Sequence, residues 1–282
     1  MYLFQGEYYS KLTEVPEEHI ARFINNPLLK DSFWFKKGEL LFWEEHYLKL
    51  MATMRILRMQ IPMKFTMEYL EKQMKSLLQH AFPTSDSSQF TGKVSLHLVK
   101  AKNPTPSDPI PETFFWFSTS EAEIPNLIKA KTPIDLYKDH YRLSGLYSTL
   151  GVDAAHWKSM AWVYAYENGF YDAVLLNEKK NIAATLLGAL FLVKGNTITT
   201  PPLSEGGVKS VYRQLLLEVI TSSEEYTLED AALSPFAIQR SDELFVLAPD
   251  GVFHSMKQYR KKEFFSSVTE TLFGRYQTKL GV

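Results

Sequence analysis

The sequence contains no cysteine among its 282 residues, which excludes a disulfide framework, a thiolate nucleophile and a cysteine-ligated metal site. No apolar run approaches the roughly 18 residues that a membrane-spanning helix needs. The first residues carry neither a basic segment nor an apolar core of signal-peptide length. We therefore expect a soluble, cytoplasmic protein.

An excess of charge of either sign is also missing. The chain has 31 Lys and Arg against 32 Asp and Glu, so its net charge is −1. Nucleic-acid and acidic-membrane binding therefore have no electrostatic support. The hydrophobic fraction of 45% and the chain length fit two compact domains, each with its own core. Aromatic residues make up 14%, which is typical of large cores and of subunit interfaces.

Several motifs that carry chemistry are absent. There is no glycine-rich nucleotide loop, no Gly-x-Ser-x-Gly sequence and no His-Glu-x-x-His pair. The seven histidines have no metal-ligand spacing, so we expect no metal site. His46, near the start of a predicted helix, is interpreted as a half-exposed structural residue.

The first third of the chain has an α+β pattern. Apolar residues at helical spacing predict one helix from Trp43, stopped by Pro62, and a second helix capped by Thr66. Short runs rich in aromatic and β-branched residues predict strands around them, with Lys37-Gly38 as a hairpin turn.

A polar, proline-containing segment at residues 118–132 is typical of a domain junction. It predicts a smaller α+β domain over residues 1–120 and a larger α/β domain over residues 121–282. The larger domain should open with a loop-rich segment, residues 133–147. A helix capped by Asp153 should follow, with these residues facing inward: Trp157, Met160, Ala161, Tyr164 and Ala165.

The stretch from Tyr164 to Glu218 organises the larger domain. It reads as a helix, an apolar strand, a polar turn, a strand pair joined at Gly195-Asn196, a Thr-Pro-Pro loop and a helix from near Val208. In this order it resembles the large domain of the fold-type IV enzymes that use pyridoxal phosphate (PLP). These class IV aminotransferases include branched-chain and D-amino-acid aminotransferases and aminodeoxychorismate lyases.

The resemblance covers nearly the whole chain. Residues 38–62 are similar to the family's strand and the helix that carries its His-x-x-Arg-Leu motif, and residues 242–264 are similar to its C-terminal strands. It implies a two-domain α+β fold with PLP in the cleft between the domains, and a homodimer.

The residues that perform the family's chemistry differ here. In the family a lysine in a Ser-x-Leu-Lys-like context forms the imine with PLP, and here the run Ser148-Thr149-Leu150 is followed by Gly151. The family's glutamate that faces the pyridine nitrogen corresponds to Ala184.

The family's phosphate contacts are changed as well. Its arginine in His-x-x-Arg-Leu corresponds to Lys49, which keeps the charge and loses the bidentate fork. Its strand threonine corresponds to Leu247. Its helix N-terminus corresponds to Lys209 and to the residues that follow before Arg213: Ser210, Val211 and Tyr212.

Two interpretations follow. The favoured one is a catalytically degenerate homologue that has lost PLP, or does not bind it covalently, and acts as a binding or interaction protein. In it, Lys49 and Arg213 face a small anion or partner, or serve as structural ion pairs. The alternative is an active PLP enzyme with a relocated lysine. Lys158 is then the nearest candidate, roughly 10 Å along its helix from the required point, whereas Lys131 and Lys138 would need a rearranged loop.

Overall fold

The computed structural model describes residues 1–4, 6–16, 29–82, 91–100, 105–110, 112–121, 126–150 and 155–281. Over these residues the chain is an α+β protein of two compact units, Met1–Ile124 (unit 1) and Pro125–Val282 (unit 2). The sequence predicts this division after residue 120. No helix in the described ranges is long and apolar enough to cross a bilayer. Gly151 and Asp153 lie outside the described residues.

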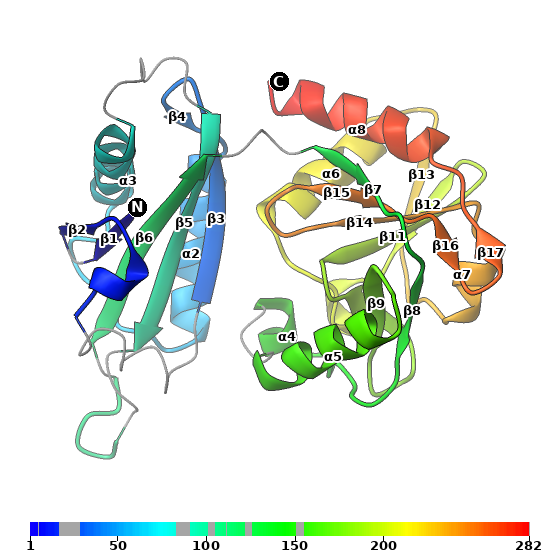
Figure 1. Ribbon diagram of the computed structural model, residues 1–282, viewed down its shortest axis with the longest axis horizontal. Coiled ribbons are helices and arrows are strands. Elements are labelled where there is room, and N and C mark those ends of the chain that lie inside the picture. Colours follow the sequence, from blue (N-terminus) through cyan, green and yellow to red (C-terminus); the bar gives the residue numbers. More distant parts are fainter. Residues whose placement is uncertain are drawn as a thin grey trace. The chain divides into compact units, whose positions relative to one another are not determined.

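Unit 1 is an antiparallel six-stranded sheet with order β2-β1-β6-β5-β3-β4 and two helices packed on one face (Figure 1). Its elements are β1 (Tyr2–Phe4), β2 (Glu7–Tyr9), the 3-10 turn η1 (Leu12–Glu14), β3 (Leu29–Lys36), β4 (Glu39–Leu40), α2 (Trp43–Ile56), α3 (Met67–Ala81), β5 (Thr91–Lys100) and β6 (Thr113–Glu121).

The helices of unit 1 follow from their apolar stripes and caps. Leu50 of α2 and Leu70 of α3 are buried in one core with residues from one face of the sheet, such as Phe33. The Thr66 hydroxyl accepts a hydrogen bond from the N–H of Tyr69, which confirms the predicted N-cap. The predicted end of α2 was wrong, because Arg58 (φ 51°) lies in the left-handed region and ends the helix before Pro62.

The predicted junction at residues 118–132 was too long. Residues 118–121 continue β6, because they pair with β5 as far as Gly92 opposite Glu121. Leu127–Lys129 forms a strand, β7, which pairs with the C-terminal part of the chain. Only residues 122–126 then separate these strands, and of these residues 122–125 are not described.

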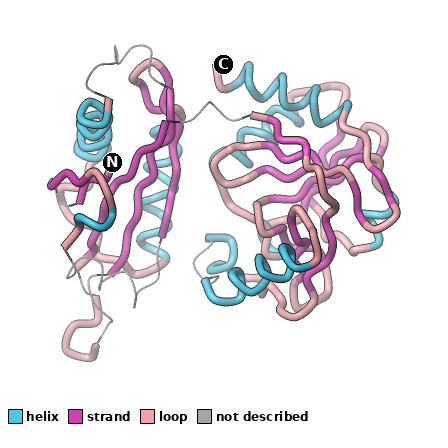
Figure 2. Tube along the Cα trace, viewed as in Figure 1, coloured by secondary structure: helices cyan, strands magenta, loops and turns pink. Residues whose placement is uncertain are grey.

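Unit 2 contains two mixed sheets, with orders β10-β9-β8-β16-β17 and β13-β12-β11-β14-β15-β7 (Figure 2). Its remaining strands are β8 (Ile134–Tyr137), β9 (Asp172–Leu176), β10 (Ile182–Thr185), β11 (Ala189–Lys194), β12 (Thr197–Thr200), β13 (Thr227–Asp230), β14 (Glu243–Leu247), β15 (Phe253–Ser255), β16 (Gln258–Tyr259) and β17 (Lys262–Glu263). Its helices are α4 (Leu146–Leu150), α5 (Ala155–Glu167), η2 (Leu203–Glu205), α6 (Val211–Thr221), α7 (Phe236–Arg240) and α8 (Ser267–Lys279).

The organising stretch has the predicted order. The strand at Asp172–Leu176 and the hairpin at Gly195-Asn196 are confirmed, the latter by antiparallel pairing of β11 with β12. Gly195 has a φ of 55°, which the tight turn requires. The predicted start of the helix near Val208 was early, because α6 begins after its cap Ser210.

Two further expectations for unit 2 were wrong. The segment expected to be a loop contains β8, which pairs in parallel with both β9 and β16. Its four residues are too few for a periodic signal to be read from the sequence. Met160, expected to face inward, is 64% exposed, whereas Ala161 and Ala165 are buried against β9.

Candidate functional site

A buried carboxylate at the start of β9 holds the turn between β10 and β11. Asp172 is fully buried, and its Oδ1 accepts hydrogen bonds from the N–H groups of Ala173 (2.7 Å), Leu186 (3.0 Å) and Leu187 (3.3 Å). Its Oδ2 has no hydrogen-bond partner among the described residues. Burial raises the pKa of the Asp172 carboxyl to about 7, although these N–H groups and the Thr185 hydroxyl act to lower it.

Lys158 lies near this carboxylate. It is half-buried on α5, and burial lowers the pKa of its amine, as does the positive charge of Arg142, while Asp172 acts in the opposite direction. Arg142 is itself buried and donates hydrogen bonds to the carbonyls of Gly206 and Ser148. Three ionisable groups from separate elements of unit 2 therefore share one partly buried region.

The raised pKa of Asp172 predicts how the free energy of unfolding changes with pH. The folded-state pKa lies above the ordinary value of 3.8. The protonated Asp172 carboxyl therefore contributes stability that is fully present below about pH 4 and is lost as the pH rises through about 7. Asp172→Asn removes this titrating group. The free energy of unfolding of the variant minus that of the wild type, measured by urea titration, should therefore rise by roughly 2 kcal/mol between about pH 5 and about pH 7.

Asp242→Asn is the matched control. The pKa of Asp242 is lowered by the N–H of Gly195 and by Lys194, so its stabilisation is lost only as the pH falls below about 4. The difference between this variant and the wild type should stay constant over the same range. A constant difference for Asp172→Asn as well would show that its carboxyl is already ionised at pH 5.

The position predicted for the pyridine-nitrogen acid lies in the core. Ala184 of β10 has no exposed surface and pairs with Leu175 of β9, just after a register shift in β10. The position predicted for the imine lysine, Gly151, is outside the described residues.

The predicted phosphate positions of unit 2 lie on α6 and β14. The Ser210 hydroxyl caps α6 by accepting the N–H of Arg213 at 3.0 Å, and Val211 and Tyr212 are buried. Leu247, the last residue of β14, is 1% exposed and pairs with Ala189 and Phe253. Apolar or aromatic side chains therefore occupy three of these positions, and at the fourth the Ser210 hydroxyl already accepts a backbone N–H.

The two cations expected to face an anion each contact a carboxylate. Arg213 Nη2 lies 3.0 Å from Asp230 Oδ1 and 3.1 Å from the carbonyl of Pro201. In unit 1, Lys49 Nζ lies 2.9 Å from Asp31 Oδ1, and His46 Nδ1 lies 3.1 Å from Oδ2 of the same carboxylate. Burial would raise the pKa of Asp31, but Lys49 and His46 together lower it.

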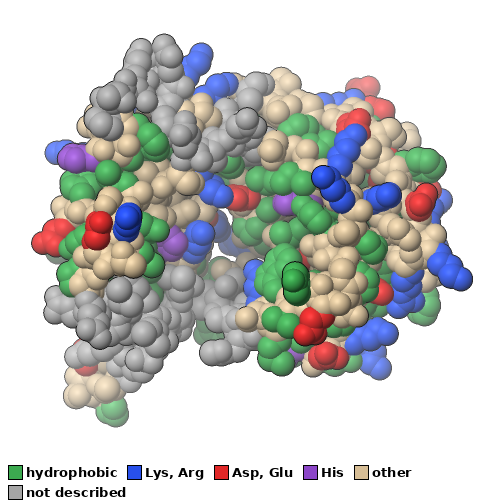
Figure 3. Space-filling model, in the orientation of Figure 1, with side chains coloured by type: hydrophobic (Ala, Val, Ile, Leu, Met, Phe, Trp, Pro, Cys, Tyr) green, Lys and Arg blue, Asp and Glu red, His purple; other side chains and the backbone are tan. Residues whose placement is uncertain are grey.

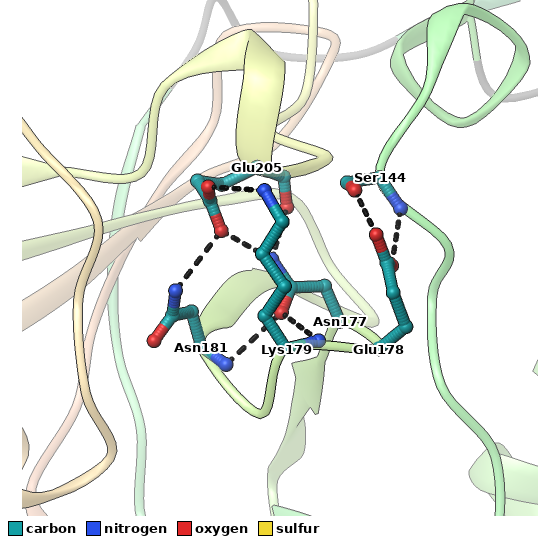
Figure 4. A network of polar contacts seen from close by, with 6 residues as sticks. All are labelled: Ser144, Asn177, Glu178, Lys179, Asn181 and Glu205. Atoms are coloured by element: carbon teal, nitrogen blue, oxygen red, sulfur yellow. Dashed lines mark hydrogen bonds and ion pairs between the residues drawn. The ribbon is translucent and has the colours of Figure 1, made fainter.

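A polar network fixes the loop that leads to α6 (Figure 4). Glu205 accepts hydrogen bonds from Asn177 (2.6 Å) and Asn181 (3.1 Å) and pairs with Lys179 at 2.9 Å. These three side chains lower the pKa of its carboxyl. The network ties the β9–β10 turn to the segment that follows the Thr-Pro-Pro loop.

Sequence reasoning missed the two buried acids, Asp172 and Asp31. Each is a charged residue inside or beside an apolar strand run, in Tyr171-Asp172-Ala173-Val174 and in Lys30-Asp31-Ser32-Phe33. A lone acid in such a run is a usable signal, since it must find partners once it is buried. His46 was interpreted as half-exposed and is fully buried, because Asp31 provides its polar partner.

Among the described residues, no group of three or more His, Cys, Asp or Glu side chains is placed to bind a metal ion.

Comparisons with known proteins agree with this architecture. A family profile described as amino-transferase class IV matches residues 29–249. No curated protein matches the chain. A putative 4-amino-4-deoxychorismate lyase from Legionella pneumophila is similar at 15% identity and a TM-score of 0.75, covering 91% of this chain and 92% of that one.

Two solved aminotransferases are similar over their length. One from Brucella abortus, bound to PLP, has 14% identity and a TM-score of 0.78, covering 100% of this chain and 99% of that one. The branched-chain amino acid aminotransferase of Escherichia coli has 11% identity and a TM-score of 0.78, covering 100% and 93%. At these identities the structures show the fold, and the profile match over most of the chain shows the family. The chain belongs to the class IV aminotransferases.

Proposed function

We propose that this chain is a catalytically degenerate class IV aminotransferase homologue that acts as a binding or interaction protein. The observation that carries the proposal is Ala184, a fully buried methyl group at the position corresponding to the acid that faces the pyridine nitrogen. An alanine cannot hold a proton on a pyridine ring.

The side chains at the predicted phosphate positions do not fit PLP either. The Leu247 side chain offers no hydrogen-bond donor, and the Tyr212 ring lies in the core, where a methyl group on Gly251 would lie 3.0 Å from it. The Ser210 hydroxyl already caps α6. A phosphate or other small anion at Lys49 or Arg213 would have to compete with Asp31 or Asp230 for the cation. An interaction with another protein is therefore better supported than an anion site at these two residues.

A second candidate, an enzyme that uses Lys158, is favoured by one observation. Burial lowers the pKa of this amine, so a larger fraction is uncharged and nucleophilic near neutral pH. This candidate needs PLP held without the ring-nitrogen acid and without the family's phosphate contacts.

Absorbance spectroscopy separates the two candidates. We expect purified protein incubated with PLP to show no yellow internal-imine band, and no transamination or lyase turnover above background. An active class IV aminotransferase treated in parallel provides the positive control. An imine band that disappears in Lys158→Arg would establish the second candidate and refute the first.

A further inference from the structure

A groove in unit 2 lies between helix α7 and the hairpin of β11 and β12. Its volume is about 390 Å³, within the roughly 300 to 1,000 Å³ of small-molecule sites. Leu192 and Leu233 line it and are buried, and Ala237 of α7 packs against the same apolar cluster. The buried hydroxyl of Ser241 also lines the groove and donates to the carbonyl of Ile238 at 2.8 Å. The inner surface of the groove is therefore mainly apolar.

Two exposed side chains of α7 form the outer part of the groove. Phe236, the first residue of the helix, is 70% exposed, and Arg240, the last, is exposed as well. Residues four apart share one face of a helix, so the ring and the guanidinium are neighbours. Helix α7 lies at the right-hand edge of unit 2 in Figure 1, and Figure 3 shows Lys and Arg side chains at this edge.

The charges around the groove leave one cation available. Arg240 has no acidic partner among the described residues, whereas Lys194, which also lines the groove, lies 3.0 Å from Asp242. Glu229 accepts a hydrogen bond from Thr199 at 3.4 Å, and neither acid is among the described residues that line the groove. A guanidinium can hold a carboxylate through two parallel hydrogen bonds. The groove therefore offers an apolar surface beside a site complementary to a carboxylate.

We propose that this groove, the α7 groove, binds a small carboxylic acid that has an apolar body. The carboxylate pairs with Arg240, and the apolar body lies on Leu192 and Leu233 with the ring of Phe236 against it. The proposal goes beyond the proposed function, because none of these residues is a position predicted to contact PLP.

Two probes with the same apolar body test the proposal, 3-phenylpropionate and the uncharged 3-phenylpropan-1-ol. In titrations followed by ligand-detected NMR, the wild type should bind the acid saturably and about tenfold or more tighter than the alcohol. Arg240→Gln should weaken binding of the acid about tenfold or more, so that the two probes bind with similar affinity. Phe236→Ala should weaken binding of both probes by a similar factor, because each loses the same aromatic contact.

Arg55→Gln and Tyr166→Ala are the matched controls. Arg55 is exposed on α2 of unit 1, and Tyr166 is 86% exposed on α5. Both variants should bind the probes as the wild type does, and far-ultraviolet circular dichroism should show that all four variants are folded. A wild type that does not bind 3-phenylpropionate saturably would overturn the proposal. So would equal affinities for the acid and the alcohol, or an affinity for the acid that is unchanged in Arg240→Gln.

Discussion

Replacing Lys49→Met is expected to lower the free energy of unfolding by about 3 to 5 kcal/mol. The reason is the buried carboxylate of Asp31, which is 6% exposed and lies 2.9 Å from the Lys49 amine. Methionine fills a similar volume and leaves that carboxylate with the His46 ring and the N–H of Ser32. Urea unfolding of the variant beside the wild type measures the loss.

The double variant Asp31→Asn with Lys49→Met should recover most of that stability. An asparagine amide can donate to His46 Nδ1 and accept from the N–H of Ser32, so neither group is left unsatisfied. Lys75→Met is the surface control, since Lys75 is 37% exposed and its pairs with Glu39 and Glu71 should contribute less than about 1 kcal/mol. An equal, small loss for both lysines would mean that Asp31 is not held as a buried ion.

Replacing Gly188→Ala is expected to cost about 3 kcal/mol or more. Gly188 follows the turn held by Asp172, and a Cβ built on it would lie 2.2 Å from the carbonyl oxygen of Leu247 and 2.8 Å from the Cα of Ala248. These are backbone atoms of β14 and the residue after it, so they cannot move aside as a flexible side chain could. The turn and the end of β14 would have to separate.

The control for Gly188 is another glycine that has room. Gly274 lies within α8, and a Cβ added to it would meet no atom within 4 Å, so Gly274→Ala should stabilise the protein by about 0.5 to 1 kcal/mol. Thermal unfolding of the two variants should therefore move in opposite directions. A melting temperature for Gly188→Ala equal to that of the wild type would contradict the close approach of the turn to β14.

The fold could be predicted from the sequence where the pattern was long or the turn chemistry specific. Thr66 as a cap and Gly195-Asn196 as a hairpin depend on local interactions, and both are confirmed. The four-residue strand β8 could not be predicted, because its place in the sheet is determined by β9 and β16, which are distant in sequence. Met160 was misplaced because a helix that is apolar all round has no single inward stripe to identify.

The residue types at the candidate site could be predicted from the sequence, but their burial and their partners could be predicted only in part. The family correspondence identified Ala184 and Leu247, but only the structure shows that both are fully packed. Lys49 and Arg213 lie on helices and their partners Asp31 and Asp230 on strands, so their ion pairs could not be assigned from spacing. Asp172 gains its raised pKa from burial, a property of the assembled core rather than of its neighbours in sequence.

Borohydride reduction after incubation with PLP, followed by peptide mass spectrometry, tests the proposed loss of imine chemistry most directly. We expect that no lysine of the chain is modified stoichiometrically, and that the scattered labelling of surface lysines is unchanged in Lys158→Arg. A stoichiometric pyridoxyl adduct at Lys158, or at any other single lysine, would contradict it.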